Sequence, residues 1–337
     1  MAGTRDVLIA GGGIIGLSLA VELAAEGLSL TVIERDRSMR GASWAAAGML
    51  AAEDPHHPAA LVPLARLSRH LYPEYLAKIE QLSQMRVPLR TTVALQQCDE
   101  SRDPATVEWL APGLRSRNFE VLEEASLDPR DLCSALPMAA RKVGVEIIED
   151  VAVTGRRSHA GSVRAETSAG EFDARWFVDC RGVFSEGEIE PRKGQMLMVA
   201  LEPRLLSCVV RTEQVYLVPR GDGRVVIGAT VERGVRDMLV HEDALAGLIA
   251  HADALLPGIA AAKRVDSWAG IRPGTPDDLP LIGATTDRNC FVASGHFRNG
   301  ILLAPGTARV MSQLLRGGVL DVSLDAFSPL RFAAVRR

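Results

Sequence analysis

A glycine-rich turn between a strand and a helix is the feature that most constrains how this chain folds. Residues 11–16 read G-G-G-I-I-G and directly follow the apolar run Val7-Leu8-Ile9-Ala10. A continuous apolar run of this length is typical of a parallel strand buried on both faces. Apolar residues then recur at helical spacing as far as Gly27, and a second apolar run, residues 30–33, ends at Glu34. This order predicts a βαβ unit that opens an α/β domain.

Each residue type in the turn suits a bound dinucleotide. Gly11 permits the tight turn, Gly13 lets a pyrophosphate approach the backbone, and Gly16 allows the helix to pack closely on the strand. The helix N-terminus offers free N–H groups and a partial positive charge to the phosphates. Glu34 can accept hydrogen bonds from ribose hydroxyls and would repel a 2′-phosphate. The turn therefore predicts FAD or NAD; the alternative is an ordinary glycine-rich βαβ turn.

A stretch of small side chains favours FAD. Residues 40–50 read R-G-A-S-W-A-A-A-G-M-L. Backbone with few side chains can lie closely against a flat ring system or a pyrophosphate. Composition alone leaves a mobile loop as the other interpretation.

Helix and strand signals continue along the chain. Asp128-Pro129 predicts a helix N-cap followed by a proline at the first helical position. Residues 57–85 predict a mostly helical stretch that Pro63 and Pro73 break or restart. A second sheet is predicted from three strand-like segments with a Gly-Asp-Gly hairpin turn at 221–223, namely residues 195–201, 208–218 and 224–231.

Four motifs together resemble one enzyme family. Besides residues 11–16 and 40–50, residues 268–275 read W-A-G-I-R-P-G-T and residues 295–305 read G-H-F-R-N-G-I-L-L-A-P. The chain thus resembles the FAD-dependent D-amino-acid oxidase superfamily, and most closely the bacterial glycine oxidases of thiamine biosynthesis. The motifs extend over nearly the whole chain.

The resemblance implies an α/β fold with two interleaved domains. The first is a glutathione-reductase-like Rossmann FAD-binding domain, and the second is a smaller substrate domain with a mainly antiparallel sheet. The FAD-binding domain is expected at 1–88, 126–190 and 262–337, and the substrate domain at 89–125 and 191–261.

The resemblance also implies site residues for non-covalently bound FAD and for a carboxylate. Arg272, Arg298 and Tyr216 fall on the family's substrate-binding positions. Each has another interpretation: Arg272 can form an ion pair with Asp277 or Asp278, Arg298 can be a surface arginine, and Tyr216 can be a core aromatic residue. We expect no acid–base residue and no metal site, with His296 packing near the flavin ring. The expected cofactor contacts are Gly11, Gly13, Ile14, Ile15, Gly16, Glu34, Arg35, Ala42, Ser43, Ala47, Gly48, Met49, Val153, His296, Phe297, Arg298, Asn299, Gly300, Ile301 and Leu302.

Two positions depart from the family pattern. Arg181 stands where the family has a small residue beside the pyrophosphate, so either its side chain points outward or the pocket differs there. Val231 stands where glycine oxidases carry methionine. A shorter side chain at 231 predicts a larger substrate pocket and leaves the preferred amine open.

The function implied is oxidative deamination of glycine or another small α-amino acid or secondary amine. The products are the imine and then the oxo acid, with O₂ reduced to H₂O₂, and the reaction can feed thiamine thiazole synthesis. The alternatives are a dehydrogenase of the same fold that passes electrons to a quinone or protein acceptor, and a flavin-binding subunit of a larger complex.

Composition narrows the partners and the compartment. Lys plus Arg number 38 and Asp plus Glu number 42, so no basic excess indicates nucleic acid or an anionic membrane. The five cysteines form no C-x-x-C pair, and the N-terminus lacks signal-peptide features. We expect a cytoplasmic protein without a membrane span, and a homotetramer by resemblance.

Overall fold

The computed structural model describes residues 5–98, 118–202 and 205–336, and within them it places the predicted βαβ unit at the centre of a sheet. Strand β1 (Arg5–Ala10) pairs in parallel with β2 (Leu30–Ile33) and with β10 (Gly170–Asp179). Helix α1 (Ile14–Ala25) connects β1 to β2. The eight strands of this first sheet run in the order β17-β18-β10-β1-β2-β7, with the β8–β9 hairpin continuing from β10. The remaining bounds are β7 Glu146–Ile148, β8 Val153–His159, β9 Ser162–Thr167, β17 Leu281–Ala284 and β18 Cys290–Ser294.

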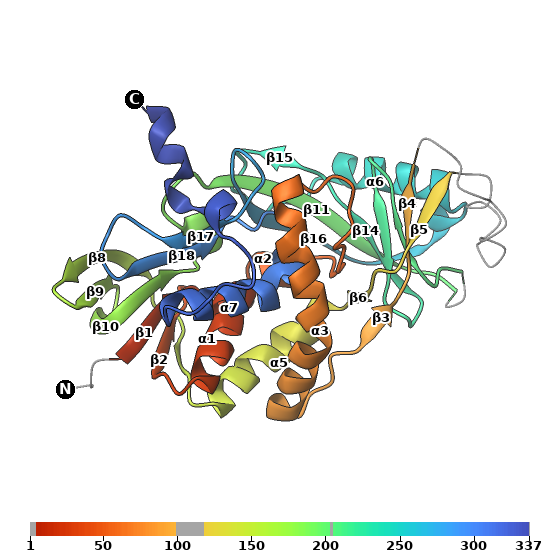
Figure 1. The fold of residues 1–337 in the computed structure, drawn as a ribbon. Helices are drawn as coiled ribbons and strands as arrows, with labels where there is room; N and C mark the ends of the chain where they lie inside the picture. Colours follow the sequence, from red (N-terminus) through yellow and green to blue (C-terminus); the bar gives the residue numbers. More distant parts are fainter. Residues whose placement is uncertain (1–4, 99–117, 203–204, 337) are drawn as a thin grey trace.

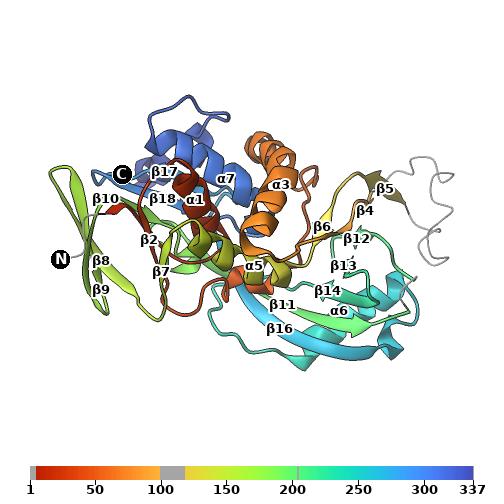
Figure 2. The same cartoon turned by 90° about the horizontal axis from the view of Figure 1, so that it is seen from below.

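Both faces of the first sheet are covered. Successive side chains of β1 point to opposite faces, and both sets are buried. Val7 and Ile9 join the core beneath the helices, whereas Leu8 and Ala10 face the β8–β9 hairpin. Figures 1 and 2 show the four helices gathered on one side of the sheet. They are α1, α3 (Val62–Ser83), α5 (Pro129–Lys142) and α7 (Gly300–Leu315).

The predicted start of α5 is confirmed, whereas the predicted break at Pro73 in α3 is wrong. Asp128 caps α5 by accepting a hydrogen bond from the Arg130 backbone N–H at 3.0 Å, as the sequence predicts. Helix α3, by contrast, runs unbroken through Pro73. Pro73 lies on the exposed face of α3, so water can satisfy the carbonyl that loses its helical donor.

The second sheet is mainly antiparallel and lies beside the first (Figure 2). Its eight strands run β15-β11-β14-β13-β12-β4-β5, with β16 pairing to β11. Helix α6 (Glu242–Leu255) packs on one face. The strands are β4 Ala94–Gln97, β5 Phe119–Leu122, β11 Glu190–Ala200, β12 Val209–Arg211, β13 Tyr216–Pro219, β14 Arg224–Gly228, β15 Glu232–Arg233 and β16 Lys263–Gly274. Strands β3 (Leu89–Thr91) and β6 (Ser126–Leu127) form a separate pair, and α2 (Ala42–Ala45) is a single turn.

Strand β16 follows the expected domain boundary at residue 262 and pairs with the second sheet. A division at residue 262 assigns β16 to the FAD-binding domain, yet β16 pairs with β11 from Lys263 opposite Ala200 to Gly274 opposite Glu190. Its backbone hydrogen bonds are therefore satisfied within the second sheet. Among the described residues, no helix is both long and apolar enough to cross a membrane.

Candidate active site

A cavity of about 1030 Å³ is lined by residues from both sheets. This volume lies at the upper end of the range of small-molecule sites. Its walls include the glycine-rich turn, the small-residue segment of residues 40–49, the turn at 296–301 and the neighbouring strand ends of the second sheet. The cavity therefore brings together segments that are far apart in the sequence. Of the residues expected at the site, all line it except Gly16 and Leu302.

The glycine-rich turn forms one end of the cavity. Gly11 has a φ of +108°, and an added Cβ there would overlap the carbonyl of Cys180. Gly16 packs against the Gly11 carbonyl, which leaves no room for a side chain. Helix α1 has no acidic residue in its first turn and no side-chain cap at Gly13. The positive end of the helix dipole thus meets the cavity without a protein anion in place, as phosphate binding requires.

Glu34 is oriented by its own backbone surroundings. One carboxylate oxygen accepts from the Gly12 N–H at 2.7 Å, and the other accepts from the Asp36 N–H at 3.0 Å. Each oxygen keeps lone pairs for further donors. The carboxylate lines the cavity and is fixed in place for ribose hydroxyls. Together with the open turn and the uncapped helix, it fits the expected FAD.

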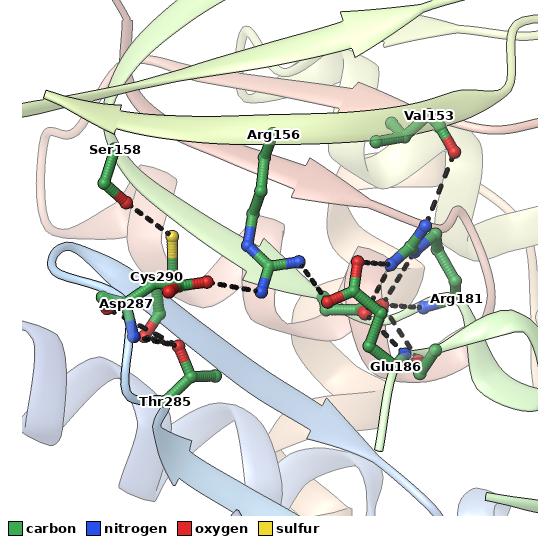
Figure 3. Close-up of polar contacts among 10 residues, drawn as sticks. Val153, Arg156, Ser158, Arg181, Glu186, Thr285, Asp287 and Cys290 are labelled. Carbon is green, nitrogen blue, oxygen red and sulfur yellow. Dashed lines mark hydrogen bonds and ion pairs between the residues drawn. The ribbon is translucent and has the colours of Figure 1, made fainter.

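Arg181 lies on the wall of this end of the cavity, and Figure 3 shows its side chain among carboxylates. Its guanidinium donates to both oxygens of Asp179, at 3.0 and 2.7 Å, to Glu186 at 3.3 Å and to the Val153 carbonyl at 3.4 Å. Burial lowers the pKa of Arg181, but Asp179 and Glu186 raise it by more, so the net pKa lies above its usual value. The wall of the cavity here therefore includes an arginine whose guanidinium is held by two carboxylates.

Figure 3 also shows how this cluster continues away from the cavity. Arg156 joins Glu186, at 2.7 Å, to Asp287, at 2.9 Å. The buried thiol of Cys290 lies 3.6 Å from the Ser158 hydroxyl. Cys290 does not line the cavity.

Arg272 occupies the opposite end, on β16. Its guanidinium lies over Gly194 of β11, where any side chain would overlap it, and it donates to the Thr230 carbonyl at 3.2 Å. Among the described residues no carboxylate pairs with Arg272: Asp277 pairs with Arg331 and Asp278 pairs with Arg192. The ion-pair interpretation of Arg272 is wrong within this part of the chain.

Tyr216 lies at the start of β13, near Arg272. Its ring lies against Gly228 of β14, which faces it in register and has no side chain to exclude it. The hydroxyl donates to the Met196 sulfur at 3.2 Å. Burial raises the pKa of Tyr216 despite the opposing charge of Arg272. The hydroxyl therefore remains a hydrogen-bond donor at neutral pH.

Arg298 reaches the cavity from the turn before α7. Its side chain is 39% exposed and lies 3.4 Å from Asp54, a cavity residue that sequence reasoning missed. Burial raises the pKa of Asp54, but the positive charges of Arg298 and Arg211 outweigh this effect, and the net pKa lies below its usual value. Asp54 is therefore ionised and holds Arg298 in place.

Arg211 is a second residue that sequence reasoning missed. It is buried at the end of β12, with Glu124 at 2.8 Å and the Gln96 side-chain oxygen at 3.0 Å. No local motif marks Arg211 or Asp54, because strand pairing of β12 with the distant β4 brings Arg211 to the cavity and a loop brings Asp54 there.

His296 is buried on the cavity wall, and its Nε2 lies 3.0 Å from the Thr307 hydroxyl. Burial lowers the pKa of His296 to about 3, so the ring is neutral at physiological pH. This agrees with packing near a ring system and not with acid–base work. Val231 is 57% exposed and lines the cavity together with Arg236 and Met238.

Comparisons with known proteins agree with this geometry. Residues 6–314 match the family model described as "FAD dependent oxidoreductase". The chain is 37% identical to a bifunctional protein ThiO/ThiG of Synechocystis sp., over 98% of this chain but only 55% of that protein. It is 31% identical to a glycine oxidase of Bacillus licheniformis, over 98% of this chain and 99% of that one. Its structure is similar to the crystal structure of glycine oxidase from Geobacillus kaustophilus, with a TM-score of 0.91, 30% identity and coverage of 97% and 99%.

Proposed function

The chain belongs to the family of FAD-dependent oxidoreductases, and from that premise we propose that it oxidises the amine of glycine or of another small α-amino acid or secondary amine. The amine loses two electrons and two protons to give an imine. Water then hydrolyses the imine to the oxo acid and ammonia. When the substrate is a secondary amine, the products are the oxo acid and a primary amine. Dioxygen takes up the two electrons and two protons and leaves as H₂O₂.

The observation that carries this proposal is the position of Arg272 and Tyr216 on the wall of the cavity that begins at the glycine-rich turn. An arginine guanidinium binds a carboxylate through two parallel hydrogen bonds. No described carboxylate occupies that fork on Arg272. The Tyr216 hydroxyl donates to the Met196 sulfur, a weak acceptor that a substrate carboxylate can replace. Arg298 adds a second cation, held by Asp54.

These residues act by positioning. Binding the carboxylate fixes the α-carbon in one orientation, and reacting atoms held about 3–3.5 Å apart gain most of the rate advantage of a bound reaction. FAD, when bound, supplies the two-electron acceptor. We assign no residue of the chain to proton transfer, because the low pKa of His296 makes its ring a weak base and the amine binds in its deprotonated form. Glu34, Gly13 and the N-terminus of α1 hold the dinucleotide.

The wider setting is part of the same proposal. The chain spans 55% of the length of the Synechocystis protein. We propose that the oxidase works in the cytoplasm as a homo-oligomer, and that its product feeds thiamine thiazole synthesis.

Anaerobic reduction of the bound flavin tests the proposal. The purified yellow protein is mixed separately with glycine, sarcosine, D-alanine and D-proline while the absorbance near ~450 nm is followed. Bleaching that air reverses, with release of H₂O₂, is the expected result and ranks the substrates. Bleaching without rapid reoxidation by air would instead identify a dehydrogenase. No bleaching by any of the four would refute the assignment of the arginines.

A further inference from the structure

The substrate end of the cavity holds two arginines that have no carboxylate partner among the described residues. Four arginines line this end, Arg211, Arg236, Arg272 and Arg298, together with the carboxylates of Asp54 and Glu213. Arg211 is paired with Glu124 and Arg298 with Asp54. Within residues 5–98, 118–202 and 205–336, neither Arg236 nor Arg272 has a carboxylate partner. Arg272 takes the α-carboxylate in the proposed reaction, which leaves the exposed guanidinium of Arg236 available for a second anion.

Arg236 belongs to a segment that forms one wall of this end. Val231, Arg236 and Met238 all line the cavity. The Thr230 carbonyl, next to Val231, accepts the hydrogen bond from Arg272, so this segment and Arg272 border the same space. Val231 and Met238 are also more than half exposed, which places apolar surface beside the Arg236 guanidinium at the cavity mouth.

The segment is anchored to the sheet. Lys193 of β11 is fully buried and donates to the Asp237 carboxylate at 2.5 Å. The same Asp237 oxygen accepts from the Leu239 N–H at 3.0 Å. Asp237 is thus engaged by Lys193 and by the backbone, although it is the neighbour of Arg236 in sequence. These contacts fix the segment and leave the Arg236 guanidinium for a ligand.

We propose that this site accepts amines that carry two carboxylates, and that Arg236 binds the second one. The inference rests on the proposed amine oxidation and names its substrate class. One carboxylate lies on Arg272 and Tyr216, the amine nitrogen and its α-carbon lie between the walls, and the second carboxylate reaches Arg236. Val231 and Met238 contact the intervening methylene. Arg236 is a specificity-determining residue in this scheme, and the bonds formed and broken are those of the proposed reaction.

The test compares matched ligands that differ by one carboxylate. Iminodiacetate and sarcosine are the substrate pair. Diglycolate and methoxyacetate are the corresponding ethers, which have no amine to oxidise, and the visible spectrum of bound FAD reports their binding. The variants are Arg236→Gln and the control Arg233→Gln; Arg233 is 67% exposed on the same segment and does not line the cavity.

We expect the native protein to bind diglycolate about tenfold more tightly than methoxyacetate, the gain of one charge-assisted contact at a partly exposed site. In Arg236→Gln the iminodiacetate-to-sarcosine ratio of kcat/KM falls about tenfold, and the diglycolate preference is lost. Arg233→Gln keeps both. Equal binding of the two ethers by the native protein overturns the proposal, as does an equal loss for both substrates in Arg236→Gln. If no amine reduces the flavin, the amine oxidation itself fails, while the two ethers still report on Arg236.

Discussion

Gly194 is the position at which one added methyl group tests the carboxylate site most directly. Gly194 faces Gly270 across the β11–β16 pair, and the guanidinium of Arg272 lies where a side chain at 194 would be. In Gly194→Ala the new Cβ overlaps the far end of a flexible side chain and not the backbone. The sheet therefore stays intact, the glycine-rich turn is untouched, and Arg272 must swing away. We expect a folded protein that retains FAD and binds the substrate carboxylate weakly.

The size of the effect follows from the interaction that is lost. A hydrogen bond to a charged group contributes about 1.5–3 kcal/mol. Since each 1.36 kcal/mol corresponds to a factor of ten, kcat/KM for sarcosine is expected to fall about 10- to 150-fold. The carboxylate contact is present before and during the reaction, so KM changes more than kcat.

Steady-state H₂O₂ formation gives the two constants, and the absorbance of bound flavin gives the FAD content. The matched control is Gly247→Ala in α6, where an added Cβ meets nothing within 4 Å. An unchanged kcat/KM in Gly194→Ala would remove Arg272 from the substrate site. Loss of FAD from Gly194→Ala alone would show that the second sheet cannot absorb the methyl group.

Three further predictions concern other parts of the site. Arg298→Ala is expected to raise KM about 10- to 150-fold with FAD retained, and full activity would exclude Arg298 from binding substrate. His296 has a folded-state pKa of about 3, below its unfolded value of 6.5, so below pH 6.5 the unfolded chain takes up a proton that the folded chain does not. The free energy of unfolding should then fall as pH is lowered from 6.5 towards 3, by up to about 1.4 kcal/mol per pH unit, and urea titrations should show a weaker fall in His296→Gln. Arg181→Ala leaves the buried Asp179 without its main partner and should lower the free energy of unfolding by about 3 kcal/mol. The control Arg157→Ala, at a side chain that is 69% exposed, should lower it by less than about 1 kcal/mol, and equal denaturation midpoints for the two variants would contradict this.

The cofactor end could be predicted from the sequence because its residues are close together along the chain. The apolar run before Gly11, the turn and Glu34 lie within one βαβ unit, and local spacing sets their geometry. Asp128 and Pro129 likewise predict the start of α5 from two adjacent residues. Pro73 shows the limit of such local rules, since exposure of that helix face decides whether the proline interrupts it.

The substrate end depends on pairing between distant strands. Arg272 is identified only through its motif, and nothing local in the sequence shows that β16, which follows the expected boundary at residue 262, pairs with β11. Asp54 and Arg236 come from loops whose path is set by contacts elsewhere, such as the Lys193–Asp237 ion pair. For Arg181, the sequence shows the departure, but the carboxylates of Asp179 and Glu186 decide where the side chain points.

One signal in the sequence does point to the substrate end, and it is a pair of glycines. A glycine inside a strand weakens the sheet and often marks a close approach by another group. Gly194 lies within β11 and admits the guanidinium of Arg272, and Gly228 ends β14 and admits the ring of Tyr216. Each glycine therefore gives up strand stability at the place where a side chain that we propose binds substrate lies against the backbone. In a predicted strand of a substrate domain, such a glycine indicates which facing strand carries the functional residue.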